Sequence, residues 1–180
     1  TTWEEKIAYM MRKVEGAYSL TILVKNAIYA VRDANGIRPL SLGKLDKGWF
    51  VASETCALDH IGAEYVRDIN PGEILRIDET GIHPLQGIEP RQSAFCLLEY
   101  IYFARPDSTL NEQLVHPVRQ MMGKLLAKEY PVDADLVIGV PDSAIAAAIG
   151  YAEESNIPYG EGLMKNRYVG RTFIQPEQSL

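Results

Sequence analysis

Short strand-like segments follow one another through the first half of the chain, too closely for parallel pairing. Turn signals such as Asn35-Gly36 and Asn70-Pro71-Gly72 separate them. A parallel crossover needs a dozen or more residues, so neighbouring segments of this kind must pair antiparallel. We therefore expect an antiparallel sheet, whose strands are 17–24, 27–32, 37–42, 49–52, 65–69, 73–77 and 82–85.

Two helices are expected around this sheet. Thr2 and Glu5 form a capping-box pattern, and apolar residues recur at helical spacing after it, which predicts an amphipathic helix over 3–15. Gly16 is expected to end this helix. A second, short helix is expected at 54–61. The first half is therefore predicted to be α+β, with a helix packed on an antiparallel sheet.

The pattern changes after a polar break at 86–93, which is the best candidate for a linker. The apolar run 94–103 is expected to be a strand. It is followed by an expected helix at 113–129, the strand 136–140, an alanine-rich helix at 144–154 and a short strand after Pro158. Alternation of helices with buried strands is typical of a parallel α/β sheet.

Composition narrows the function classes. The net charge of −6 argues against a general nucleic-acid binder, which is normally basic. No apolar run reaches the roughly 18 residues that span a bilayer, and no signal segment opens the chain, so we expect a cytoplasmic protein without a membrane partner. Two distant cysteines, Cys56 and Cys96, favour a reduced compartment. The sequence contains neither a CxxC nor an HExxH motif, so it does not indicate a complete metal site.

The junction Val140-Pro141-Asp142-Ser143 is the first candidate site. An apolar strand is expected to end there and a helix to begin, and such a junction is the usual ligand crevice of α/β sheets. An oxygen of Asp142 or Ser143 can bind a divalent cation or lie beside a phosphate. The alternative is that one of these residues only caps the helix, and position alone favours that alternative.

The second candidate is the segment 165–172, in which three cations, an aromatic residue and a glycine occur within an otherwise acidic chain. A mobile loop of this composition can close over a polyphosphate. A solvated basic loop is the alternative. Because the segment follows the strand–helix junction along the chain, we expect the Ser143 helix start and residues 165–172 to converge on one polyphosphate pocket. For Arg105-Pro106-Asp107-Ser108 a capped turn before a helix is favoured. A buried thiol is the default for Cys96, and hairpin formation explains Asp33 and Asn35. His60, His83 and His116 receive no role.

Several strings in this sequence resemble one family, glutamine phosphoribosylpyrophosphate amidotransferase or amidophosphoribosyltransferase. The match extends in order from Gly16 to Leu180. EYIYFARPDS and KNRYVGRTFIQP in one chain are highly specific, whereas RDANG alone is weak. The strings are RDANGIRPLSLG (32–43), VASET (51–55), EYIYFARPDS (99–108), VPDS (140–143) and KNRYVGRTFIQP (165–176).

The resemblance implies the later part of an N-terminal-nucleophile glutaminase sandwich (α/β/β/α), residues 1–90, joined to the early part of a type I phosphoribosyltransferase domain, residues 94–180. In this family, glutamine is hydrolysed at a terminal cysteine and the ammonia passes through an internal channel. It attacks C1 of phosphoribosylpyrophosphate and displaces magnesium pyrophosphate. The product is 5-phosphoribosylamine, the first committed intermediate of purine (IMP) biosynthesis. Purine nucleotides as feedback inhibitors and a homo-oligomer are implied as well.

Carried over by position, Ser143 resembles the family's hydroxyl ligand to Mg²⁺. Cys96 lies where iron–sulfur members place their first 4Fe-4S ligand, although members without a cluster can carry Cys there too. The remaining matches form the flexible loop that closes over the substrate: Lys165, Arg167, Tyr168, Gly170, Arg171 and Thr172.

Parts of the family's machinery have no match in this sequence. These are the nucleophilic cysteine, the glutamine-binding and oxyanion-hole residues, the strand that ends in two aspartates and three cluster cysteines. We therefore expect an internal fragment that catalyses neither half-reaction by itself. A regulatory or binding module that keeps the fold without catalysis is the alternative. Another phosphoribosyltransferase with an unrelated partner domain is disfavoured by the RDANGIRPL string.

Overall fold

The computed structural model describes residues 1–46 and 48–170. These residues form two compact units, one over Thr1–Val118 and one that begins at Arg119. The domain division that the family resemblance implies, 1–90 and 94–180, stays a prediction.

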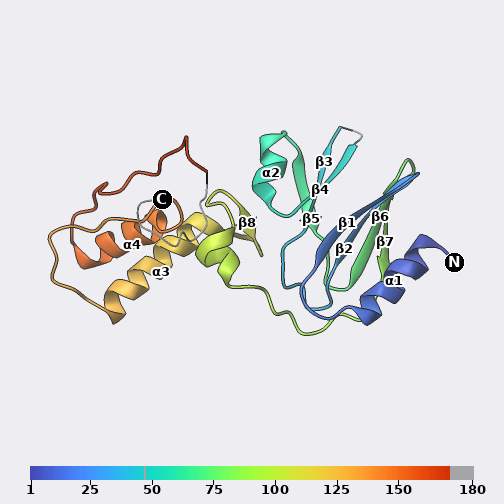
Figure 1. The fold of residues 1–180 in the computed structure, drawn as a ribbon, viewed down its shortest axis with the longest axis horizontal. Coiled ribbons are helices and arrows are strands. Elements are labelled where there is room, and N and C mark those ends of the chain that lie inside the picture. Colours follow the sequence, from blue (N-terminus) through green and yellow to red (C-terminus); the bar gives the residue numbers. More distant parts are fainter. Residues whose placement is uncertain (47, 171–180) are drawn as a thin grey trace. The chain divides into compact units, whose positions relative to one another are not determined.

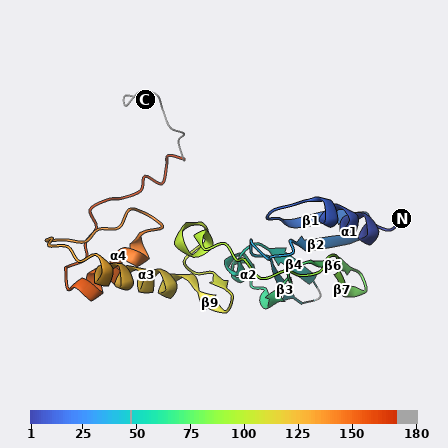
Figure 2. The same cartoon turned by 90° about the horizontal axis from the view of Figure 1, so that it is seen from below.

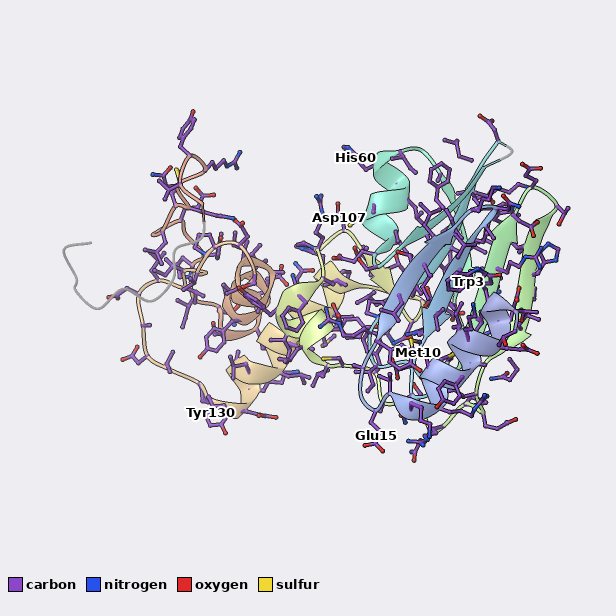
Figure 3. The ribbon with its side chains drawn as sticks, turned by 45° about the vertical axis from the view of Figure 1, so that its right-hand side comes forward. Trp3, Met10, Glu15, His60, Asp107 and Tyr130 are labelled. Carbon is purple, nitrogen blue, oxygen red and sulfur yellow. The ribbon has the colours of Figure 1, made fainter. Side chains whose placement is uncertain are left out.

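The first unit opens with α1 (Trp3–Lys13), which carries the predicted capping box. The Glu5 amide donates to Thr2 Oγ1 at 3.2 Å, and the Thr2 amide donates to Glu5 Oε2 at 2.9 Å. The helix ends at its C-cap residue Val14, close to the expected position. Gly16 follows with φ 102°, a conformation that glycine adopts without the strain of a side chain. Figure 3 shows Trp3 and Met10 on this helix.

The strands pair antiparallel as predicted, and they form two sheets, whereas strand spacing alone had predicted one. The first sheet has the order β1-β2-β6-β7 and the second has the order β4-β3-β5. Their bounds are Ser19–Val24 (β1), Ala27–Arg32 (β2), Ser41–Leu45 (β3), Gly48–Ala52 (β4), Glu64–Asp68 (β5), Glu73–Asp78 (β6) and Gly81–Gln86 (β7).

Alternate residues of β2 face two different parts of the core, as the period of a strand requires. Tyr29 and Val31 pack with Ile7 and Met11 of α1. Ala30 faces the other way and packs in a cluster shared with residues of the second sheet. One sheet therefore has the helix on one face and the second sheet on its other face (Figure 1).

The outer face of the second sheet is covered by α2 (Thr55–His60). Leu42 of β3 belongs to the core between the sheets, so its neighbour Gly43 points outward. A Cβ at Gly43 would lie 2.7 Å from Leu58 Cδ2, which shows how closely the helix approaches the strand. The layers of this unit run helix, sheet, sheet, helix.

β3 begins later than the sequence pattern predicts, at Ser41 instead of residue 37. The cause is the buried guanidinium of Arg32, which donates to the carbonyl oxygens of Gly36 at 3.0 Å and Arg38 at 2.9 Å. Those oxygens are thereby bonded within the loop, and the segment before Ser41 stays out of the sheet ladder.

The prediction of a strand over 94–103 is wrong. Residues Glu99–Phe103 form a short π-helix, η1, in which the Ala104 amide donates to the Glu99 carbonyl at 3.0 Å. An apolar run of this length has no alternation, so its period does not distinguish a buried strand from a helical turn. A short hairpin of β8 (Thr109–Leu110) and β9 (Gln113–Leu114) then precedes α3 (Val115–Glu129).

The end of the polar segment that was expected to be a linker is hydrogen-bonded to the turn that contains Asn35. The amides of Arg91, Ala94 and Cys96 donate to the carbonyls of Ala34, Asn35 and Ile37 at 2.8, 3.0 and 2.9 Å. The Asn35 side chain adds a bond to the Gln92 carbonyl at 2.9 Å. Residues 91–96 are therefore fixed to the first unit.

The second unit contains most of α3 and the helix α4 (Ile145–Ser155), which lie side by side in Figures 1 and 2. Glycines allow the two helices to touch through their backbones. A Cβ on Gly123 would lie 1.9 Å from the Ala147 carbonyl oxygen, and one on Gly150 would lie 2.0 Å from that of Gln120. Only hydrogen fits at either position.

The strand expected at 136–140 is present only as a single parallel bridge between Val137 and Tyr159. The Val137 amide donates to the Pro158 carbonyl at 2.9 Å, and the Gly160 amide donates to the Val137 carbonyl at 3.0 Å. The predicted parallel direction is correct, but no wider parallel sheet forms within the described residues. Leu136, Ile138 and Val140 consequently stay exposed.

None of the helices in the described part of the chain has the length and apolar character needed to cross a bilayer.

Candidate functional site

A pocket of about 640 Å³ lies in the second unit, where the bridged segment meets the start of α4. It is lined both by Pro141 and Asp142 of the 140–143 junction and by the basic segment from 165 onward, the two stretches expected to share one pocket. Its walls are formed by Gly139, Pro141, Asp142, Ile145, Tyr159, Glu161, Leu163, Met164, Lys165, Asn166, Arg167 and Tyr168.

The junction does not cap its helix in the way that position alone favours. The N-cap residue of α4 is Ala144, and no side chain accepts a hydrogen bond from the first turn. Asp142 instead forms an ion pair with Lys165, with Oδ2 and Nζ 3.0 Å apart. Ser143, between Asp142 and Ala144, is not among the residues that line the pocket, and its role as a Mg²⁺ ligand stays a prediction.

The basic segment has four described members that line the pocket: Lys165, Asn166, Arg167 and Tyr168. The Tyr168 amide donates to Asn166 Oδ1 at 3.0 Å, which folds the segment into a local turn. Gly170 has open space around it, since a Cβ there would meet nothing within 4 Å. Arg171 and Thr172, the remaining predicted substrate-binding residues, lie outside the described residues.

The pocket carries both signs of charge. Asp142 and Glu161 supply carboxylates, while Lys165 and Arg167 supply cations. Sequence reasoning missed Glu161 and the apolar wall formed by Tyr159 and Met164. The signal for Tyr159 was its place after Pro158, in a segment that an α/β order pairs with residues 136–140. Nothing in the local sequence distinguishes Glu161 from an ordinary exposed acid.

A second cavity of about 560 Å³ lies within the first unit, lined by Tyr18, Arg38, Glu54, Glu99 and Phe103 among others. Arg38 Nε lies 2.6 Å from Glu99 Oε1, and its guanidinium lies 4.7 Å from the centre of the Phe103 ring. Burial raises the pKa of the Glu99 carboxyl, and the positive charge of Arg38 opposes that rise. The segments 32–43 and 99–108, which both carry the family resemblance, are therefore in direct contact.

Asp33 and Asn35 form the predicted turn, in which Asp33 Oδ1 accepts the Asn35 amide at 2.9 Å. The Arg105–Ser108 turn is also present, closed by the Ser108 amide and the Arg105 carbonyl at 3.1 Å. It leads into the β8–β9 hairpin instead of directly into a helix. Ser108 Oγ and the Arg105 amide both donate to Glu54 Oε2, at 2.8 and 2.7 Å.

Asp107, labelled in Figure 3, pairs with Arg105 on the surface, where Oδ2 and Nη2 are 2.8 Å apart. This pair holds the pKa of the Asp107 carboxyl below its usual value. The ion pair therefore explains the two charged residues of the RPDS string without a bound ligand.

The described residues offer an incomplete set of metal donors. No group of three or more His, Cys, Asp or Glu side chains converges within this part of the chain. Cys96 is a free thiol of intermediate exposure, and its amide is bonded to Ile37. A 4Fe-4S cluster takes four thiolates, so Cys96 alone does not form such a site.

Fold and site together define a layered antiparallel α+β unit, followed by a unit with a charged pocket at a strand–helix junction. The chain is 54% identical over 180 residues to amidophosphoribosyltransferase from Mycobacterium tuberculosis, and 53% identical over 182 residues to that of Synechococcus elongatus. The resemblance to the amidophosphoribosyltransferase family is thus confirmed along the whole chain. The chain spans 34% and 37% of the length of these two relatives.

Solved structures agree with this relationship. The glutamine phosphoribosylpyrophosphate amidotransferase of Bacillus subtilis, complexed with ADP and GMP, has a TM-score of 0.92 at 47% identity. It is matched over 99% of this chain and 39% of its own. A structure described as the allosteric regulatory enzyme of purine biosynthesis also has a TM-score of 0.92, at 48% identity, over 100% of this chain and 39% of its own. No family model matches the chain.

Proposed function

We propose that this chain forms part of an amidophosphoribosyltransferase, which makes 5-phosphoribosylamine, pyrophosphate and glutamate from phosphoribosylpyrophosphate, glutamine and water. The observation that carries the proposal is the convergence of Asp142 and Lys165 on one pocket, together with identity above 50% to enzymes of that name. The pocket is the proposed site for the pyrophosphate group of the substrate.

The charges of the pocket suit the departure of pyrophosphate. A leaving group that gains negative charge is stabilised by cations fixed around it, and Lys165 and Arg167 are in place to provide them. The planar guanidinium of Arg167 can contact two phosphate oxygens at once. Tyr168 and the unhindered Gly170 would let the segment close and exclude water.

Magnesium prefers oxygen ligands, and it usually keeps several waters while it binds substrate phosphates, so it needs few oxygens from the protein. Ser143 would supply a hydroxyl oxygen. The bound ion would neutralise charge on the phosphate oxygens. For a 4Fe-4S cluster the described residues supply one candidate ligand, Cys96, and the other thiolates would have to come from elsewhere in the protein.

The layer order of the first unit supports the glutaminase half of the proposal. Helix, sheet, sheet and helix is the order of the α/β/β/α sandwich implied by the resemblance. The single parallel bridge between Val137 and Tyr159, flanked by α4, supports the start of a phosphoribosyltransferase sheet after residue 94. Cytoplasmic location and a homo-oligomer stay predictions.

Regulation by purine nucleotides is part of the same proposal. The Bacillus subtilis relative was solved with ADP and GMP bound. We expect the complete protein to bind such nucleotides, and no residue of this chain is assigned to them.

A chimera tests the function directly. The corresponding 180 residues of the Mycobacterium tuberculosis enzyme would be replaced by this chain, and glutamine-dependent release of pyrophosphate from phosphoribosylpyrophosphate measured. We expect activity within about tenfold of the parent enzyme, a difference of about 1.4 kcal/mol in the barrier. Lys165→Ala in the chimera should lower turnover strongly, whereas Lys128→Ala, an exposed lysine outside the pocket, should not.

The alternative function, a non-catalytic binding or regulatory module, makes the opposite prediction. A folded chimera that binds phosphoribosylpyrophosphate and releases no pyrophosphate would favour the module. Equal activity of the chimera and its Lys165→Ala variant would remove Lys165 from the proposed site.

A further inference from the structure

The ion pair between Asp142 and Lys165 joins the two walls of the pocket. Asp142 stands at the strand–helix junction, and Lys165 stands in the basic segment more than twenty residues later. Their charged atoms are 3.0 Å apart, and the two side chains remain 68% and 55% exposed. Such exposure leaves the pair open to a competing anion from solvent.

A phosphate in this pocket would compete with Asp142 for the same ammonium group. Lys165 is a compact point charge with three donors, and a phosphate group with more than one negative charge attracts it more strongly than the single charge of Asp142. The carboxylate of Asp142 also repels an incoming phosphate. Exposed pairs of this kind contribute little to stability, so a strongly charged ligand can displace one partner.

We propose that Asp142 is a positioning residue, which holds Lys165 over the pocket of the ligand-free protein and releases it to a phosphate group. This inference rests on the proposed function, since it takes the pocket to be a polyphosphate site. The pair sets the position from which Lys165 moves to its ligand. It also lowers the affinity of the pocket for anions that do not displace Asp142.

The first test measures, without any ligand, whether the ion pair protects Lys165 from trypsin. Trypsin cleaves after Lys165 only when that side chain is free, so the pair should protect the peptide bond that follows it. Asp142→Asn should speed this cleavage about two- to fivefold, the range that corresponds to an exposed ion pair. Asp142→Glu should restore protection. Asp133→Asn, an exposed acid that does not line the pocket, is the matched control and should leave the rate unchanged.

The second test measures the binding of inorganic pyrophosphate to the 180-residue chain by calorimetry, with and without Mg²⁺. Asp142→Asn should tighten binding about two- to fivefold, and less at high salt. In a Lys165→Ala background the same substitution should have no effect. This double-mutant cycle separates competition for Lys165 from general repulsion, which would act in both backgrounds.

Three results would overturn the inference. These are an unchanged rate of cleavage after Lys165 in Asp142→Asn, tightening that persists without Lys165, and weakening that appears only with Mg²⁺. The last would make Asp142 a metal ligand. If the cleavage result holds but the wild-type chain binds no pyrophosphate, the ion pair stands as a latch and the proposed polyphosphate site fails.

Discussion

At the scale of single residues, Arg32 is the most consequential side chain of the first unit. It is buried, and its guanidinium donates to the carbonyl oxygens of Arg38, Ile69 and Gly36 at 2.9, 2.7 and 3.0 Å. Burial lowers the pKa of Arg32, yet a guanidinium stays protonated at any ordinary pH. One planar cation therefore fixes the whole loop that carries the RDANG string.

Replacement of Arg32 by Lys should destabilise the first unit by about 3 kcal/mol, because lysine keeps the charge and loses the planar fork that reaches three carbonyls. Trp3 and Trp49, the two tryptophans of the chain, both lie in this unit. Urea unfolding followed by tryptophan fluorescence would measure the loss. Arg12→Lys on the exposed surface of α1 is the control, and an equal effect there would contradict the explanation.

Asp78 gives a pH dependence at the tip of the β6–β7 hairpin. The Thr80 hydroxyl and amide donate to its carboxylate at 2.6 and 2.8 Å, and Arg76 and His83 approach it as well. These contacts hold the pKa of Asp78 well below the unfolded value of 3.8. The ionised group thus adds stability above that value, and the contribution is lost as the pH falls from it toward the lower folded pKa.

Asp78→Asn should therefore be less stable than wild type at about pH 6, and the difference should shrink below about pH 4. Unfolding in urea at a series of pH values would show the two curves converge. Asp46→Asn, an exposed acid in the β3–β4 turn, should give no such convergence. A gap that is constant with pH would argue against the ionised carboxylate as the source.

At the scale of elements, the decisive contact of the second unit is the crossing of α3 and α4. Gly123 and Gly150 let one helix backbone touch the other, so the contact is set by the absence of side chains. Alanine is normally the better helix former, by about 1 kcal/mol over glycine. Here the clash with a carbonyl oxygen outweighs that gain, since a Cβ on Gly150 would lie 2.0 Å from it.

Gly150→Ala should destabilise the α3–α4 pair by about 3 kcal/mol or more, because the Cβ has a fixed position and the Gln120 group that it meets is backbone, so neither can rotate away. Hydrogen exchange of the α4 amides would report the loss as faster exchange. Glu153→Ala on the same helix removes only an exposed pair with Lys124 and should change exchange little. Unchanged or slower exchange in Gly150→Ala would contradict the prediction, because it would show that the added Cβ does not destabilise the helix pair.

The strand expected at 94–103 is the element for which the prediction from the sequence was wrong. Residues 94–103 are apolar and were expected to form a strand, yet Glu99–Phe103 form a π-helix. Glu99 is 2% exposed and paired with Arg38, so the tertiary contact with the RDANG loop holds it inside. The strands at 19–24 and 27–32, by contrast, could be predicted from the sequence, because turn-forming residues stand on both sides of them.

At the scale of the whole molecule, the chain corresponds to about a third of the enzymes it resembles. The pocket of the second unit contains the proposed binding groups. The family resemblance implies that turnover needs further residues that have no match in this sequence. If the proposed site binds a phosphate group, the groups that complete the reaction would have to come from elsewhere in the protein.

The isolated 180-residue chain should catalyse neither glutamine hydrolysis nor the release of pyrophosphate from phosphoribosylpyrophosphate. Glutamate and pyrophosphate would be measured after incubation with both substrates and Mg²⁺. The active chimera serves as the positive control. Pyrophosphate release by the isolated chain above the uncatalysed rate would contradict the prediction and would place a complete site within these residues.

The sequence by itself determined the antiparallel pairing of the first half, the helix with its Thr2–Glu5 cap, and the family that the strings resemble. Each of these depends on residues close together in the chain, whose spacing and turn chemistry act locally. Only the tertiary structure decided which strands join which of the two sheets, that Glu99 lies inside against Arg38, and that Asp142 meets Lys165 at a pocket. Those outcomes depend on contacts between residues distant in the sequence, and local spacing carries no record of such contacts.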